Sequence, residues 1–192
     1  KFSASGQRLW STYYGLSSIE QERTFSQGVA CENGFVYITG SSGASNGMTT
    51  TGVFQQGVTD AGNAFVAKFD TSGNRVWGSY LGGSGSDNGN CIAVRDGVVL
   101  VAGSTKSPDQ IATLGALQTQ LYPPEAENNR NGYINAISTD GTTKYWGSYY
   151  GGQGISNIWG VDFNESGSIF LAGTTQSTVN IATSGSKKKK KN

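Results

Sequence analysis

The sequence contains no histidine, and only 14% of its residues are charged. Without imidazole the chain cannot build a Ser-His-Asp triad, and it lacks the commonest general base and transition-metal ligand. Its two cysteines, Cys31 and Cys91, are too few for a disulfide scaffold and are wrongly spaced for a zinc site. No apolar run reaches eighteen residues, which excludes a transmembrane helix. We therefore expect no metal, no cofactor and no membrane span.

Basic residues cluster at one place only, the run from Lys187 to Lys191. Removing these five charges from the formal net charge of +1 leaves −4, so the rest of the chain is mildly acidic. A nucleic-acid-binding domain carries its basic residues together on the folded surface. We therefore predict no nucleic-acid partner, and we interpret residues 186–192 as a solvated lysine-rich tail.

Glycine is abundant, with 29 residues, and much of it belongs to a repeated pattern. A tryptophan followed by an aromatic residue and a glycine recurs at steps of 67 and 69 residues, in Trp10 to Gly15, Trp77 to Gly82 and Trp146 to Gly151. A period of this size without a helical pattern predicts a repeated sheet unit. We divide the chain into repeats at 1–69, 70–138 and 139–185, of which the first starts within a unit and the last is truncated.

Each unit contains four strand-like stretches, recognised by alternating apolar residues and by glycine turns. In the middle of the chain they cover 91–95, 98–103, 132–138 and 144–149, with hairpin turns at Asp96-Gly97 and at 139–141. Four antiparallel strands per repeat are typical of a β-propeller blade. We therefore predict an all-β, propeller-type array of about three repeats of 67–70 residues.

This array should be an incomplete propeller. The chain begins at the end of a third strand, Lys1-Phe2, and should supply a fourth strand at 9–14. Two full sets of four strands follow, and then a single hairpin at 158–174. Closed propellers typically have four to eight blades, so we expect an open arc to which further blades come from outside this segment or from other copies.

The repeated aromatic residues could stack on a ligand, but their recurrence at one position of every unit favours packing between blades. We therefore expect Trp77 and Trp146 to be buried at matching positions. The paired glycines Gly82-Gly83 and Gly151-Gly152 are expected in the tight turns where the chain passes from one blade to the next. The first repeat has Gly15-Leu16 instead, so we expect a looser or differently shaped corner there.

Cysteine and acidic positions also follow from the repeat. Aligning Gly34 with Gly97 places Cys31 at an inward-facing strand position and Cys91 on the opposite face. Buried free thiols are expected, and a bridge between neighbouring units is the alternative. The clearest carboxylates fall in predicted turns, where Asp bonds its own backbone, namely Asp70, Asp96, Asp140 and Asp162. The others lie in polar stretches, namely Glu20, Glu22, Glu125, Glu127 and Glu165.

Two kinds of acidic site are alternatives to this turn assignment. A paired-carboxylate glycosidase stays open, because separation in space is not visible in the sequence. A calcium site is a further alternative in the segment 84–88, although the equivalent segment 153–157 lacks the acid. The repeat therefore argues against a recurring metal site.

Long irregular segments, 41–63 and 104–131, separate the two hairpins of each unit and hold most of the variation between repeats. Loops on a rigid scaffold are the usual site of recognition. The longest departure from the repeat runs from Tyr122 to Asn131. Our candidate ligand-binding residues are Tyr122, Glu125, Glu127, Arg130 and, in the first repeat, Phe54. A surface glycan or another protein is the expected partner.

The segment from Phe69 to Gly83, together with Cys91-Ile-Ala-Val and with Leu100 to Ser107, resembles the bacterial seven-bladed β-propeller (SBBP) repeat. It is similar to the version found in large surface or secreted proteins of the Bacteroidetes. The resemblance implies an extracellular or cell-surface module of a long protein, exported by the type IX pathway, with no general catalytic residues.

On this resemblance we expect a non-catalytic structural or adhesive segment that acts as a spacer or binding platform. The alternatives are a carbohydrate-binding propeller and the propeller of a secreted polysaccharide-active enzyme. A quinoprotein-type propeller is a further alternative, because Phe69 to Trp77 resembles its repeat locally. The chain departs from that pattern by lacking a vicinal cysteine pair and a clear calcium-binding cluster.

Overall fold

The structure is a computed structural model that describes residues 1–15, 23–44, 47–57, 62–122, 130–179, 181–183 and 186. Within these ranges the chain forms strands and turns and no helix, which confirms the all-β prediction. No helix long and apolar enough to cross a membrane is found among the described residues. The strands are β1 (Thr24–Glu32), β2 (Phe35–Ser42), β3 (Asn63–Phe69), β4 (Arg75–Leu81), β5 (Asp87–Arg95), β6 (Val98–Thr105), β7 (Asn131–Ser138), β8 (Lys144–Tyr150), β9 (Ser156–Phe163) and β10 (Ile169–Thr175).

These strands form three antiparallel sheets, none of which closes on itself. Sheet 1 has the order β1-β2-β3-β4, sheet 2 has the order β5-β6-β7-β8, and sheet 3 is the hairpin β9-β10. The predicted repeat boundaries at 69/70 and 138/139 lie between the third and fourth strands of a sheet. Each sheet is therefore offset by one strand from the sequence repeat.

Local sequence explains the hairpins that open sheets 1 and 2. Asn33-Gly34 and Asp96-Gly97 both have two consecutive positive φ angles, 51° and 81° in the first and 49° and 83° in the second. This is the type I′ turn, whose twist matches that of the flanking strands. It fixes the register, so that Glu32 pairs with Phe35 at the end of the first hairpin.

The four strands expected in the middle of the chain are all present as β5 to β8. The main difference is that β5 begins at Asp87 rather than Cys91. A register shift between Gly89 and Cys91 leaves Asn90 as an extra residue, and such a bulge breaks the period of two. The alternating pattern therefore identified only the part of β5 beyond the bulge.

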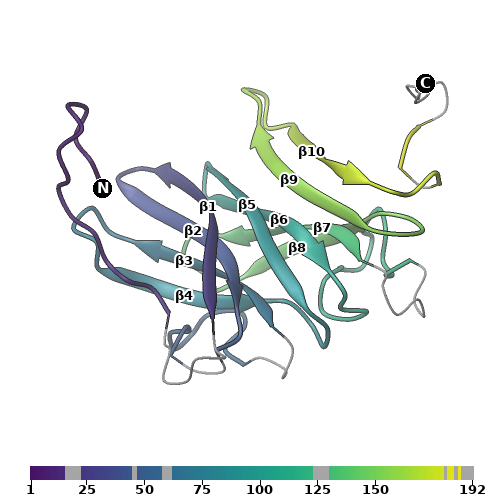
Figure 1. The fold of residues 1–192 in the computed structure, drawn as a ribbon, viewed down its shortest axis with the longest axis horizontal. Helices are drawn as coiled ribbons and strands as arrows, with labels where there is room; N and C mark the ends of the chain where they lie inside the picture. Colours follow the sequence, from purple (N-terminus) through teal and green to yellow (C-terminus); the bar gives the residue numbers. More distant parts are fainter. Residues whose placement is uncertain are drawn as a thin grey trace.

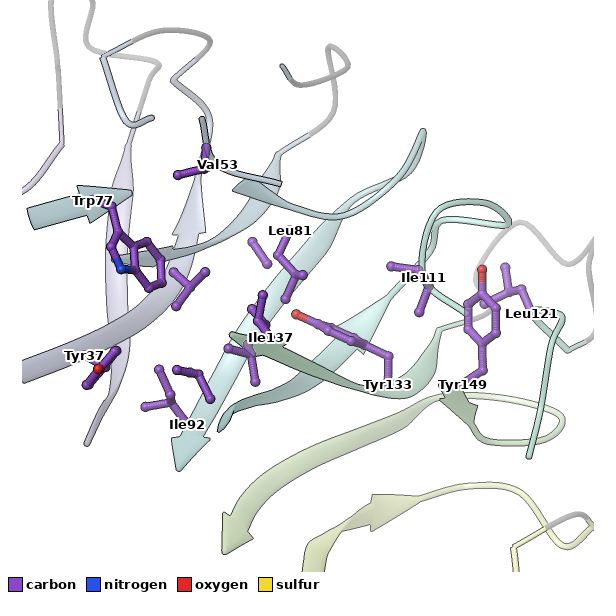
Figure 2. Close-up of a cluster of buried hydrophobic side chains, with 14 residues drawn as sticks. Tyr37, Val53, Trp77, Leu81, Ile92, Ile111, Leu121, Tyr133, Ile137 and Tyr149 are labelled. Atoms are coloured by element: carbon purple, nitrogen blue, oxygen red, sulfur yellow. The ribbon is translucent and has the colours of Figure 1, made fainter. Parts of the chain in front are cut away.

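The sheets stack face to face along the chain, as Figure 1 shows. Contacts between sheets centre on their first strands, with β1 and β2 against β5, and with β5 and β6 against β9. Side chains from sheets 1 and 2 meet in the main core (Figure 2). Its members are Tyr37, Val53, Ala64, Val66, Trp77, Leu81, Ile92, Val99, Val101, Ile111, Leu121, Tyr133, Ile137 and Tyr149.

A second cluster lies between sheets 2 and 3, where Ala93 and Leu100 meet Ile158 and Val161. Burial on both faces is thus greatest in sheet 2, whose strand β7 is buried throughout. In contrast, β10 is exposed along most of its length. Sheet 2 is buried on both faces because sheet 1 packs against one face and sheet 3 against the other.

The segment that joins the second and third strands returns along the outer edge of its own sheet. In sheet 1, the Thr50 N–H donates to Gly78 O at 3.0 Å, and the Tyr80 N–H donates to Gln55 O at 3.2 Å. In sheet 2, Thr113 and Gln118 make the same two bonds with β8. These loops satisfy part of the edge strands β4 and β8, which would otherwise offer free backbone groups to other chains.

Two sequence-based expectations are wrong. Residues 9–14 do not form a strand; the N-terminal segment makes only an isolated bridge between Phe2 and Arg8. A fourth strand needs a third strand to pair with, and only Lys1 and Phe2 stand in that position. Cys31 is exposed rather than buried, because it faces the side of sheet 1 that no other sheet covers. Cys91 is buried, and both thiols are free.

Candidate functional site: the contacts between successive sheets

The repeated tryptophans bind the turn of the sheet that follows. Trp10 donates from Nε1 to the carbonyl oxygen of Thr71 at 2.8 Å. Trp77 donates from Nε1 to the carbonyl oxygen of Thr139 at 3.0 Å. Thr71 and Thr139 occupy the same position in the turn between the third and fourth strands. One contact therefore occurs twice, from the N-terminal segment to sheet 1 and from sheet 1 to sheet 2.

The glycine of this turn lies flat against the indole ring. Gly73 has φ +88°, and a Cβ atom placed on it would lie 2.9 Å from Cε3 of Trp10. Gly141 has φ +75°, and its Cβ would lie 2.6 Å from Cδ2 of Trp77. Both glycines are needed for two reasons, the left-handed backbone and the close approach of the ring. The turn and the tryptophan are thus complementary surfaces.

Trp77 is buried, with 5% of its surface exposed, as expected, but Trp146 is 37% exposed, and for Trp146 the prediction of burial is wrong. The rings of Trp10 and Trp77 are covered by the turns at 71–73 and 139–141. Among the described residues no third and fourth strand follow β10, so no such turn covers Trp146. Trp146 thus occupies the same repeat position as Trp77, but no described turn packs against its ring.

A lysine reinforces the contact between sheets 1 and 2. Lys68 donates from Nζ to Thr139 O at 3.1 Å, the same oxygen that accepts from Trp77. The ammonium also lies 3.9 Å from the centre of the Phe35 ring. Burial lowers the pKa of Lys68, and the charges of Asp140 and Glu32 oppose that shift. The turn carbonyl is therefore held by two donors from the preceding sheet.

Glutamine side chains fasten the edge loops to the glycine that closes the motif. In sheet 1, the Gly82 N–H donates to Oε1 of Gln55 at 3.2 Å, and Gln55 Nε2 donates to Gly82 O at 3.1 Å. In sheet 2, the Gly151 N–H donates to Oε1 of Gln118 at 3.0 Å. The two glutamines are 63 residues apart, so aligning the loops by this step would have found them. Sequence reasoning missed them because it treated these loops as variable.

The closing glycines serve close approach rather than an unusual backbone. A Cβ on Gly82 would lie 2.2 Å from Oδ2 of Asp87, and one on Gly151 would lie 2.8 Å from Cγ of Asn131. Neither has a positive φ, whereas Gly15 has φ +127°. The tight-turn backbone that we expect for Gly82 and Gly151 is therefore not the reason that the structure shows for them. The corner at Gly15, expected to have a different shape, is the one with a left-handed glycine.

Asp87 is a buried carboxylate whose oxygens have several donors. Thr105 Oγ1 donates to Oδ1, while Ser107 Oγ at 2.8 Å and the Gly83 N–H at 3.0 Å donate to Oδ2. Burial raises the pKa of Asp87 above its usual range, and these hydrogen bonds oppose the shift. The described residues hold no group of three or more His, Cys, Asp or Glu side chains suited to a metal ion. Through its hydrogen bonds from Thr105 and Ser107, Asp87 links the start of β5 to the end of β6 and the loop that follows it.

The raised pKa of Asp87 predicts how stability depends on pH. The folded protein binds a proton at Asp87 more readily than the unfolded chain, so this group stabilises the fold below its ordinary pKa of 3.8. That contribution is lost as the pH rises through the raised folded value. Relative to Asp87→Asn, which does not titrate, the free energy of unfolding should therefore fall between pH 3 and pH 7. Denaturant unfolding of both proteins across this range measures it, and a difference that grows with pH would contradict the prediction.

The turn carboxylates act locally, as their positions suggested. Asp70 Oδ1 accepts from the backbone N–H groups of Ser72 and Asn74. Asp140 Oδ1 accepts from Ser138 Oγ and from the Thr142 N–H. These hydrogen bonds lower the pKa of both carboxyls. Both aspartates therefore shape the turns that receive Trp10 and Trp77.

The three predicted ligand-binding residues that the structure describes, Phe54, Tyr122 and Arg130, do not line one common hollow. Phe54 is half-buried and packs against the main core, and its N–H donates to Gly141 O at 3.0 Å. Tyr122 is 38% exposed, and Arg130 lies beside Ser104, with Nη1 3.5 Å from its hydroxyl. Glu125 and Glu127 lie outside the described residues, as do Glu20, Glu22 and residues 187–192 of the lysine tail.

Tyr122 lines a hollow of about 900 Å³ between the loop after β6 and the segment that follows β10. Gln118, Thr119 and Gln120 contribute amide and hydroxyl groups, and Tyr150 contributes a second ring. A hollow of about 600 Å³ lies nearby and is lined by Trp146, Leu114, Leu117, Ile134, Phe170 and Leu171 among others. Both are lined mainly by apolar surface, and the hollow beside Tyr122 has the larger polar share.

No protein-family model matches the chain, and no curated protein matches it either. The functional argument therefore depends on the repeated contacts described above.

Proposed function

We propose that this chain is a non-catalytic segment of a β-propeller-type repeat array that acts as a rigid structural or adhesive module. The observation that carries the proposal is the contact of Trp10 and Trp77 with the turn of the next sheet. A contact that repeats at a constant step builds an array from neighbouring interfaces, and such arrays serve as extended scaffolds. The first strands β1, β5 and β9 lie next to one another, as blades around an axis would place them.

The resemblance to the SBBP repeat supports placing this module in a secreted or cell-surface bacterial protein, exported by the type IX route in the Bacteroidetes. Further blades of the array would come from the same longer chain or from other copies. The module would then hold other parts of that protein, or its ligands, at a fixed distance from the cell surface.

The proposal excludes turnover of a substrate by this segment. Asp87, the most deeply buried of the described carboxylates, already accepts three hydrogen bonds from its own sheet. Among the residues that the structure describes, no carboxylate lines either of the two hollows. Assays of the purified chain with polysaccharides and artificial glycosides should give no product above a blank, and turnover that disappears in Asp87→Asn would contradict the proposal.

Glycan binding at the hollow beside Tyr122 is a second candidate function. It is favoured by Tyr122 and Tyr150, which line this hollow together with Gln118 and Gln120. Sugar-binding sites combine an aromatic face with a few directed polar groups. On a glycan array, any bound glycan should lose at least about tenfold in affinity on Tyr122→Ala, a change of about 1.4 kcal/mol. Phe54→Ala is the matched control, since Phe54 lies away from this hollow.

A further inference from the structure

The apolar hollow around Trp146 is lined by residues of sheet 2 whose equivalents in sheet 1 pack against the next sheet, but no described strand packs against them here. In the interface between sheets 1 and 2, Val66 and Trp77 of sheet 1 meet Tyr133 and Ile137 of β7, together with the turn at 139–141. Ile134 and Trp146 of sheet 2 hold the positions of Val66 and Trp77, and both line the hollow. Sheet 3 consists of β9 and β10, so no described strand takes the place of β7 there.

The N-terminal segment, residues 1–15, carries the matching turn without a tryptophan against it. Phe2 bridges to Arg8 as Phe69 pairs with Arg75, 67 residues later. Gly6 in this turn has φ +81°, close to the values of its equivalents Gly73 and Gly141. A Cβ on Gly6 would meet nothing within 4 Å, whereas the equivalent glycines touch an indole ring. No turn therefore packs against the ring of Trp146, and no tryptophan packs against the turn at 3–6.

Two side chains of the N-terminal segment are exposed although their equivalents are buried. Phe2 is 67% exposed, and its equivalents Phe69 and Ile137 are 5% and 0% exposed. Tyr13 is fully exposed, while its equivalents are buried and donate to carbonyl oxygens of their own sheets, Tyr80 to Ala44 at 2.6 Å and Tyr149 to Ser107 at 2.8 Å. The segment thus presents an apolar face that lacks its usual cover.

The opposite face of the segment is already fixed to sheet 1. The Tyr14 ring lies 5.2 Å from that of Phe65, and its hydroxyl donates to Met48 O at 2.7 Å. The segment and β10 lie at opposite ends of the long axis of the molecule (Figure 1). The free turn and the uncovered tryptophan of one molecule therefore cannot meet each other.

We propose that copies of this chain associate head to tail, with the N-terminal segment of one copy seated in the hollow around Trp146 of another. The turn at 3–6 covers the indole of Trp146, Phe2 enters the hollow, and the Tyr13 hydroxyl donates to Ser177 O, the carbonyl equivalent to those of Ala44 and Ser107. The contact is heterologous, because it joins the N-terminal segment of one copy to the opposite end of the next. Such a contact builds a closed ring where successive copies return to the first, and an open chain where they do not. The inference rests on the same tryptophan–turn contact as the proposed function and adds a partner to it.

The apolar hollow suits this occupant better than it suits a sugar. Its lining side chains are mainly aliphatic and aromatic, from Leu114, Leu117, Ile134, Phe170 and Leu171. Leu114 and Leu117 are 104% and 84% exposed, and an apolar patch of this kind marks a protein interaction site. The occupant must therefore bring apolar side chains, as Phe2 and Tyr13 do.

The test uses the full 192-residue chain in sedimentation equilibrium over a hundredfold range of concentration. The average mass of the wild type should rise with concentration above the mass of a monomer. Tyr13→Ser blocks one end and Trp146→Ser the other, and each should weaken self-association at least tenfold. Mixing the two variants should restore dimers, because each keeps the end that the other lacks. Trp159→Ser is the control, since Trp159 is 55% exposed but does not line the hollow.

Each other outcome overturns the inference. A wild type that stays monomeric, a mixture that stays monomeric, or equal weakening by Trp159→Ser would exclude a specific head-to-tail contact. Thermal unfolding of each variant identifies any that fails to fold, and Phe2→Ser then replaces Tyr13→Ser as the N-terminal variant. A monomeric wild type in which Trp77 is still needed for stability would reject the head-to-tail contact and leave the proposed function standing.

Discussion

Replacing Trp77 with alanine should lower the free energy of unfolding by about 3 to 5 kcal/mol, the usual cost of removing a large buried aromatic side chain. The ring is 5% exposed and belongs to the main core between sheets 1 and 2. The carbonyl of Thr139 keeps its bond from Lys68 in this variant, so the loss comes from packing rather than from an orphan acceptor. Equilibrium denaturation with urea measures the change.

Trp146→Ala is the matched control, because it makes the same substitution at the same position of the next sheet. Trp146 is 37% exposed and has no turn against it, so its loss should cost about 2 kcal/mol, less than the loss of Trp77. Measurements are made at a low protein concentration, where copies do not associate. Equal costs for the two variants would show that the turn of the following sheet contributes nothing to the burial of Trp77.

Gly141→Ala should lower the free energy of unfolding by about 2 to 5 kcal/mol, for two separate reasons. A left-handed φ of +75° costs a residue with a Cβ about 1 to 2 kcal/mol. The new methyl group would also lie 2.6 Å from Cδ2 of Trp77, and overpacking of this kind costs about 1 to 3 kcal/mol more.

Gly97→Ala separates these two reasons. Gly97 has φ +83°, and its Cβ would meet nothing within 4 Å, so only the backbone cost of about 1 to 2 kcal/mol is expected. Urea denaturation of both variants gives the difference, which is the contribution of the indole contact. A Gly97→Ala variant as unstable as Gly141→Ala would show that the backbone alone explains the glycine.

Two polar groups inside the main core depart from the repeat and were not predicted. Tyr133 and Asn135 stand where sheet 1 has Phe65 and Ala67, and all four residues are buried. The Tyr133 hydroxyl and both polar atoms of the Asn135 amide have no hydrogen-bond partner. Burying such groups costs free energy. The fold accommodates this cost because apolar packing between sheets 1 and 2 supplies most of the stabilisation of the core.

The sequence by itself determined the all-β class, the hairpins and the four strands of the central unit. Those features depend on local chemistry, because Asp96-Gly97 adopts the positive φ angles of a hairpin turn and alternating residues fit a strand. The step between the tryptophans also identified Trp77 as a packing residue. Local rules failed at the bulge at Asn90, where an extra residue shifts the pattern by one.

Only the tertiary structure decided which repeat positions are covered. Tyr13 and Trp146 occupy positions whose equivalents in another unit are buried, and Cys31 a position whose equivalent, Val94, is half-buried. All three are exposed to different degrees. Burial in a stack of sheets depends on whether a neighbouring sheet is present, and this information lies tens of residues away along the chain. The same dependence left Gln55 and Gln118 unrecognised, since their role arises from the return of each loop along its own edge strand.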